Sequence, residues 1–148
     1  DWVQVEGRLS DYYGEREITV SSAVRVQWVR LGAPLGPLRM ATGELGETHE
    51  GLLVEVAGRV TGWGPDTVYL DDGSGEVEIY FGRSQMVDKP WVEKGQTYLV
   101  VGVASQYASA MPYEGGYRLL PRYDGDVIPA PSELPVTGVG LSPHGRQA

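Results

Sequence analysis

The densest group of chemically active side chains in the sequence is the acidic stretch DDGSGE, which runs from Asp71 to Glu76. Clustered carboxylates are the ligands that hard divalent cations such as Ca²⁺ prefer. The spacing differs from that of an EF-hand loop, in which the final glutamate comes much later. Asp-Gly is also typical of tight hairpin turns, because glycine adopts the positive φ that such turns need. The stretch therefore predicts a hairpin turn, with Asp71 and Asp72 as weak metal candidates.

Other side chains that could carry catalysis are few and scattered. The chain has no cysteine, which excludes disulfides, thiolate zinc sites and cysteine nucleophiles. The two histidines, His49 and His144, are far apart, and nothing in the pattern brings a nucleophile to Glu114, Asp124 and Asp126. Acid–base catalysis needs a partner group within hydrogen-bond reach. We therefore expect a non-catalytic protein without a cofactor.

The composition indicates a turn-rich globular chain with an acidic surface. Its 148 residues are 41% apolar and include 21 glycines and 10 prolines. The net charge of −8 disfavours bulk electrostatic capture of DNA or of an anionic membrane. No apolar stretch approaches 18 residues, so no membrane segment is predicted. Because the chain begins at Asp1 rather than Met, we expect it to come from a longer polypeptide.

Apolar residues follow a period of two rather than 3.6. They alternate with polar residues around 54–60, 68–70, 77–81 and 99–103, and Gly, Pro or Asp bounds each run. This pattern predicts half-buried antiparallel strands. A weak helical pattern covers 84–93, where Pro90 limits a helix to a turn or two. A Tyr- and Gly-rich loop over 105–116 separates the fourth strand from short strands at 117–120 and 126–128.

Three strands, a short helix, a fourth strand, a long loop and a fifth strand form the order of a five-stranded OB-fold barrel. The segments EGLLV at 50–54, YLDDGSG at 69–75 and YRLLPR at 117–122 resemble the OB-fold domains of secreted bacterial proteins. Those domains accompany extracellular endonuclease or lamin-tail modules, and the resemblance covers about 47–129. It implies an all-β extracellular module whose catalytic partner, where there is one, is a separate domain.

The N-terminal segment resembles the second half of this barrel. The stretch beginning at Trp2 aligns with the one beginning at Tyr98, and the stretch beginning at Glu17 aligns with the one beginning at Tyr117. We interpret these residues as strands four and five of an OB unit whose first three strands are absent, with one more strand at 24–29. Unpaired strand edges recruit other strands. We therefore expect them to pair with the barrel of the same chain or with a neighbouring chain.

The sequence divides into four segments. Residues 1–30 are N-terminal strands that form a partial OB-like repeat, 31–46 are a linker, 47–129 are the barrel, and 130–148 are a Pro/Gly-rich tail. Within the tail, LPVTG at 134–138 resembles a sortase anchoring motif. The apolar segment and basic end that must follow such a motif are missing, so an exposed tail is the simpler interpretation.

The outer face of strands two and three is the usual ligand face of an OB barrel, and aromatic residues there can stack bases while arginines follow phosphates. Between 49 and 128, however, twelve acidic residues outnumber six basic ones, and Glu76 and Glu78 lie on this face. The charge therefore disfavours nucleic acid. The ligand-face candidates are Trp63, Tyr69, Tyr80, Arg59, Arg83, Tyr107, Tyr113 and Arg118.

Two functions stay open at this point. The first is structural self-association of an extracellular module, as a repeating subunit of a surface assembly or filament through strand pairing in trans. Its partner is then itself or the parent polypeptide. The alternative is a single-strand nucleic-acid-binding accessory domain of a secreted nuclease-like protein. The assembly candidates are Trp2, Val3, Val5, Tyr12, Tyr13, Ile18, Val20, Leu134 and Val136.

Overall fold

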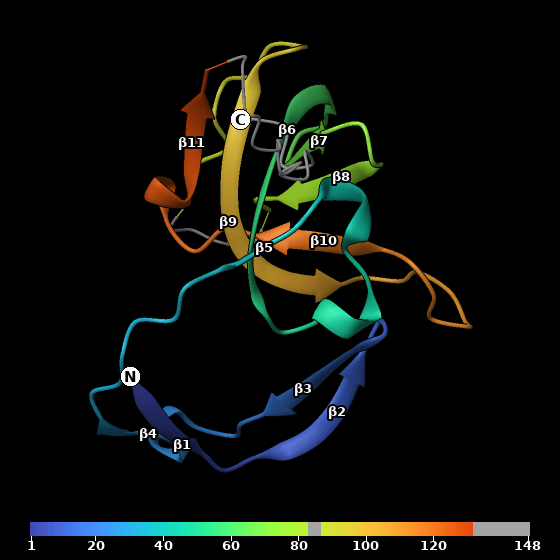
Figure 1. The fold of residues 1–148 in the computed structure, drawn as a ribbon. Coiled ribbons are helices and arrows are strands. Elements are labelled where there is room, and N and C mark those ends of the chain that lie inside the picture. Colours follow the sequence, from blue (N-terminus) through green and yellow to red (C-terminus); the bar gives the residue numbers. More distant parts are fainter. Residues whose placement is uncertain (83–86, 132–148) are drawn as a thin grey trace, which may run out of the picture.

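In the computed structural model, which describes residues 1–82 and 87–131, the chain forms a β-barrel with a separate group of strands beside it (Figure 1). We call this second group, residues 1–30, the arm. All described elements are β-strands or short 3₁₀ turns, and no α-helix occurs among the described residues. The predicted all-β class is confirmed.

Five strands close the barrel. They are β6 (Leu53–Trp63), β7 (Thr67–Asp71), β8 (Glu76–Tyr80), β9 (Thr97–Gln106) and β10 (Tyr117–Leu120). The first three form an antiparallel meander, β10 runs parallel to β8 and antiparallel to β9, and β9 returns to pair with β6. This closed arrangement of five strands is the OB-fold.

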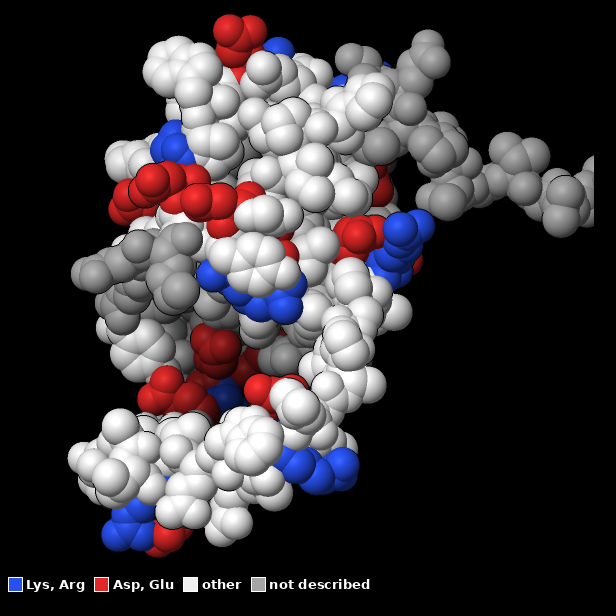
Figure 2. Space-filling model, turned by 90° about the vertical axis from the view of Figure 1, so that its left-hand side faces the viewer, with Lys and Arg blue, Asp and Glu red and all other residues white. Residues whose placement is uncertain are grey.

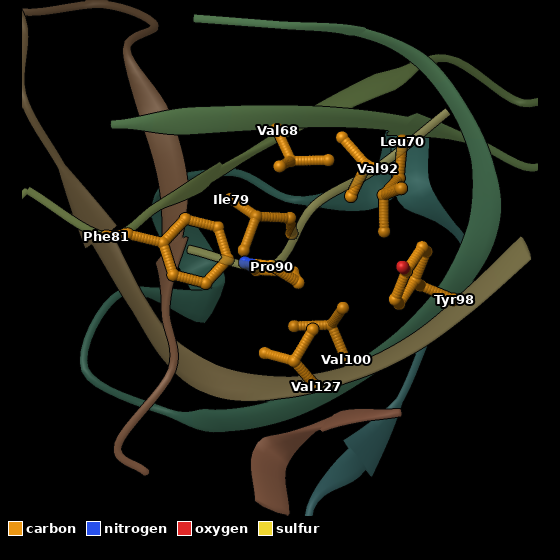
Figure 3. Close-up of a pocket in the computed structure, with 9 residues that line it drawn as sticks. All are labelled: Val68, Leu70, Ile79, Phe81, Pro90, Val92, Tyr98, Val100 and Val127. Atoms are coloured by element: carbon orange, nitrogen blue, oxygen red, sulfur yellow. The ribbon is translucent and has the colours of Figure 1, made fainter. Parts of the chain in front are cut away.

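The interior of the barrel is filled by the apolar residues that alternate along its strands. Figure 3 shows side chains of β7, β8 and β9 pointing toward one another across the barrel. They leave a cavity of about 10 Å³, which is no larger than one water molecule needs. The interior is therefore a packed core and not a ligand site. The largest of its fully buried apolar side chains are Leu70, Ile79, Leu119, Val54, Val56, Val60 and Val100.

Two short strands extend the barrel sheet. β5 (Leu38–Arg39) pairs in parallel with β6, and β11 (Val127–Ala130) pairs antiparallel with the first half of β9. Three 3₁₀ turns accompany them: η2 (Thr42–Glu44), η3 (Glu47–His49) and η4 (Asp124–Asp126). Part of the segment 31–46, predicted to be a linker, thus contributes a strand and a turn to the barrel.

The predicted helix over 84–93 is wrong for the residues that the structure describes. Residues 87–93 adopt no helix, while 83–86 lie outside the described part. Val87 and Val92 are buried in the core, so this stretch is a loop that contributes two side chains to the barrel interior, and it also contains Pro90. Proline removes a backbone donor and disfavours helical conformation in the residue before it. Burial of the two valines and the presence of Pro90 thus favour a loop over the weakly predicted helix.

The arm consists of two pairs of strands. β1 (Trp2–Val5) pairs antiparallel with β4 (Val26–Arg30), and β2 (Arg8–Tyr12) pairs antiparallel with β3 (Glu15–Thr19). The β2–β3 turn at Tyr13 and Gly14 has positive φ at both residues, as a type I′ hairpin requires. The turn η1 (Ala23–Arg25) precedes β4, which is the additional strand predicted at 24–29. Two-stranded pairs are only marginally stable in water on their own.

Candidate functional site

The arm repeats the second half of the barrel in three dimensions. β9 pairs with β11 through its first half and with β10 through its second half. In the same way β1 pairs with β4, and β2 pairs with β3. A 3₁₀ turn precedes both β4 and β11, closed by the Arg25 N–H donating to the Ser22 carbonyl and the Asp126 N–H donating to the Tyr123 carbonyl. The predicted half-repeat therefore has matching strand pairing.

Two glycines mark the same point in both halves. A Cβ on Gly7 would lie 2.6 Å from the Thr19 carbonyl oxygen, and a Cβ on Gly102 would lie 3.0 Å from the Leu120 carbonyl oxygen. In each case the strand passes close to its neighbour's backbone: a side chain at Gly7 would collide with it, and a side chain at Gly102 would make an unusually tight contact. Gly7 thus corresponds to Gly102, and Thr19 corresponds to Leu120.

This correspondence corrects the sequence alignment by one residue. Val5 pairs with Val26 as Val100 pairs with Val127, so Val5 corresponds to Val100. The sequence alignment had matched Val5 with Val101 instead. A shift of one residue along a strand moves every side chain to the opposite face. The corrected register therefore decides which arm residues occupy core positions.

Apolar arm residues at these core positions are exposed, although their counterparts are buried. The exposed fractions are 39% for Val5 against 1% for Val100, 68% for Leu9 against 2% for Ala104, and 50% for Ile18 against 0% for Leu119. In Figure 2 the arm, at the bottom of the view, presents a mostly uncharged surface. We call the core-equivalent side of the arm its inner face; it comprises Val3, Val5, Leu9, Ile18 and Val26.

The arm also has open strand edges, whereas the corresponding edges in the barrel are paired. β9 pairs on its other side with β6 through residues 97–103, and β10 pairs on its other side with β8. Among the described residues, the corresponding sides of β1, β2 and β3 have no strand partner. The arm therefore combines an exposed apolar face with unpaired backbone groups.

The turn of the β2–β3 hairpin is the part of the arm that contacts the barrel. The Ala108 N–H donates to the Tyr13 carbonyl at 2.7 Å, and the Ser105 hydroxyl donates to Glu15 at 2.8 Å. The Arg16 N–H donates to the Glu50 carboxylate at 2.9 Å. Acidic side chains gather in the recess between the arm and the barrel (Figure 2). Hydrogen bonds at its turn thus fix the arm while its inner face stays exposed.

A stack of aromatic and arginine side chains adds to this contact. The Tyr13 and Tyr107 rings lie 4.4 Å apart, and Tyr12 meets Tyr13 edge to face at 4.7 Å. The Arg118 guanidinium lies 4.8 Å from the Tyr107 ring and 4.2 Å from the Tyr80 ring, distances at which cations attract aromatic faces. Three predicted ligand-face residues thus come together next to the arm.

The other ligand-face candidates do not join this stack. Tyr69 is half-buried on β7, and Trp63 and Arg59 are exposed on β6. Tyr113 is exposed in the loop after β9, where its carbonyl accepts a hydrogen bond from the Gln106 side chain. Arg83 lies outside the described residues.

The assembly candidates occupy several places. Trp2, Val3, Val5 and Ile18 are exposed along the arm, and Val20 is half-buried after β3. Tyr12 and Tyr13 lie at the turn against the barrel, while Leu134 and Val136 lie outside the described residues. The sequence pattern did not single out Leu9 and Val26, which the corrected register places on the inner face. It also missed Glu15 and Glu50, whose bonds across the recess join segments distant in sequence.

The acidic stretch at 71–76 forms the predicted hairpin turn. Asp71 accepts hydrogen bonds from the Gly73 and Gly75 N–H groups, and both glycines have positive φ. Asp72 accepts hydrogen bonds from the N–H and hydroxyl groups of Thr42 and of Ser74. The described residues contain no group of three potential metal ligands. The two carboxylates therefore tie the turn together.

No family model matches this chain, and no curated protein matches it. Among solved structures, the chain is similar to an OB-fold protein, "OBody AM3L09 bound to hen egg-white lysozyme". The two sequences are 20% identical, the match covers 56% of this chain and 88% of the other, and the TM-score is 0.46.

Within the described part of the chain, none of the helical segments has the length and apolar character needed to cross a membrane.

Proposed function

We propose that this chain is a non-catalytic structural module of an extracellular protein, and that it associates with other OB-type units through the strands of its arm. Isolated copies of the chain then pair arm to arm. The observation that carries this proposal is the exposure of the arm's inner face at positions whose counterparts form the barrel core. The extracellular setting rests on the resemblance of residues 47–129 to OB-fold domains of secreted proteins.

Burial of the inner face and pairing of the open strand edges would both favour association. Burying a fully exposed Val, Leu or Ile side chain contributes about 1.5–3 kcal/mol. The five inner-face side chains are between 39% and 68% exposed, so each would contribute roughly half of that. The open edges of β1, β2 and β3 offer backbone donors and acceptors to an incoming strand. Such a contact, repeated head to tail without closing, produces a filament.

The arrangement gives less support to the alternative, in which the barrel binds single-stranded nucleic acid. Base stacking requires free aromatic faces. Arg118 lies over both the Tyr80 and Tyr107 rings, and Tyr13 packs against Tyr107. The net charge of −8 opposes a phosphate backbone as well.

Light scattering on a sizing column tests the proposal. The wild-type chain should have a concentration-dependent mass above the monomer value of 16.1 kDa. Val5→Asp should weaken this association at least tenfold, because it places a charge on the inner face. Gln4→Asp is the matched control, since Gln4 is the adjacent residue on the opposite face of β1 and should associate like wild type. A monomeric wild-type chain at all concentrations, or an equal loss of association in Val5→Asp and Gln4→Asp, would contradict the proposal.

A further inference from the structure

We infer that the arm is the closing half of a second OB barrel, and that its partner is a three-stranded antiparallel meander of the β6–β7–β8 kind from another OB-type unit. This inference rests on the proposed function in one respect, namely that the arm is the docking element. It goes further by naming the partner and the register in which the partner binds.

The first support is the position of the arm's open edges. In the barrel, the meander contacts the closing half through two strands: β6 lies antiparallel to β9, and β8 lies parallel to β10. β1 and β2 together correspond to β9, and β3 corresponds to β10. The two edges that the meander covers in the barrel are therefore the edges that stay open in the arm.

The second support is the number of segments. The described chain contains one meander, β6–β8, and two closing halves, the arm and β9–β11. The meander is already engaged with β9 and β10. If two copies of this chain exchanged their meanders, each chain would still have two closing halves and only one meander, so one closing half per chain would stay unpaired. Complete closure of the arm therefore needs a meander from outside the described residues.

The third support is the chemistry of the arm's inner face. Val100 and Leu119 are buried against the meander's inward residues, which include Val56 and Ile79. Their counterparts Val5 and Ile18 are aliphatic as well. A fitting partner thus has apolar residues at every second position of its strands, as β6, β7 and β8 do.

The correspondence also gives the register of the docked partner. Ala57 of β6 pairs with Leu99 of β9, and Leu99 corresponds to Gln4. In the second barrel, the partner residue equivalent to Ala57 should therefore lie opposite Gln4. The partner residue equivalent to Glu55 should lie two positions further along, because Glu55 pairs with Val101.

A fusion protein tests this register directly. Gln96, the residue before β9, corresponds to Asp1, so a second copy of residues 34–95 can be joined ahead of Asp1 in the full chain with the native connection. The fusion raises the effective concentration of the meander at the arm. Because the chain has no cysteine, any disulfide in a variant with two introduced cysteines reports the contact between those two positions.

Two matched cysteine pairs are compared under mild oxidation. One joins Ala57→Cys in the added copy with Gln4→Cys, and the other joins Glu55→Cys in the added copy with Gln4→Cys. A disulfide needs Cα atoms about 4.4–6.8 Å apart, whereas diagonal neighbours are about 7–8 Å apart. We expect the first pair to form an intramolecular disulfide at least tenfold faster than the second. Ala57→Cys with Leu99→Cys in the resident barrel is the positive control.

Equal rates for the two pairs, or no intramolecular disulfide when the positive control forms one, would overturn the inference. Intermolecular cross-links through Gln4→Cys would show that a second arm, rather than the meander, lies along the edge of β1, and would also overturn the inference. The light-scattering test of the unmodified chain is independent of this outcome. A monomeric chain with an in-register disulfide contradicts only self-association, whereas an oligomeric chain without one contradicts only the meander.

Discussion

Asp72 is a residue whose ionisation contributes to stability. Burial alone raises its pKa, but hydrogen bonds from Ser74 and Thr42 outweigh burial and lower the pKa below its ordinary value. A carboxyl whose pKa is lower in the folded state stabilises that state above its unfolded pKa of about 3.9. This contribution is lost as the pH falls through the lower folded pKa.

We expect Asp72→Asn to lower the free energy of unfolding by about 1 kcal/mol at pH 7, since charge-assisted hydrogen bonds are replaced by weaker ones at an exposed turn. The difference in the free energy of unfolding between Asp72→Asn and wild type should become smaller as the pH falls below about 4, because Asp72 then becomes protonated in the wild type. Urea unfolding at several pH values measures both effects. Asp66→Asn, in the exposed turn after β6, is the control. A difference that stays constant down to pH 2 would disprove this role for the Asp72 carboxylate.

At this scale, local patterns in the sequence were informative and distant contacts were not. The turn at 71–76 followed from Asp-Gly chemistry, which acts within a few residues. Arg118 and Tyr80 were both predicted on the ligand face, but the contact between them was not predicted. The hydrogen bonds from Ser105 to Glu15 and from Arg16 to Glu50 join segments far apart in the chain, and no local pattern marks them.

Among the elements, the β2–β3 hairpin has a distinct task, because its turn attaches the arm to the barrel. Tyr13 contributes twice, through its ring against Tyr107 and through its carbonyl, which accepts the Ala108 N–H. An aromatic pair contributes about 0.5–1.5 kcal/mol beyond burial of its area. The attachment is thus local and separable from the barrel core.

Tyr13→Ala should loosen the attachment and leave the barrel intact. We expect amide exchange of Ala108 to accelerate about fivefold, which corresponds to a loss of about 1 kcal/mol. The barrel's urea midpoint should stay unchanged. Tyr69→Ala is the control, because Tyr69 lies on β7 outside the stack. Unchanged exchange at Ala108 would mean that the ring does not hold the arm.

The sequence predicted most elements and the buried faces of β6, β7 and β8, but not the buried face of β9. Period-two alternation located the barrel strands, yet it placed Leu99, Val101 and Val103 on the patterned side of the fourth strand. The structure buries Tyr98, Val100 and Ala104 instead and leaves the first three half-buried. Because β9 has apolar residues on both faces, the alternation of apolar and polar residues does not show which face is turned toward the barrel core. The same ambiguity produced the one-residue error in aligning the arm.

At the scale of the whole molecule, the described residues form one closed barrel and one open half. The closed part buries its apolar residues, whereas the open part exposes residues of the same kind at the same positions. This difference cannot be found in composition or periodicity, because it depends on which strands are present to cover each half. It is the physical basis for assigning the arm to association.

Amide hydrogen exchange as a function of protein concentration tests this assignment most directly, because it locates the contact as well as detecting it. We expect alternate amides along β1 and β2 to be unprotected in dilute solution and to gain at least tenfold protection as the concentration rises. Amides of β6 and β9 in the closed barrel should be protected throughout. If exchange in β1 and β2 does not depend on concentration while the chain associates, the contact lies elsewhere and the account of the arm is wrong.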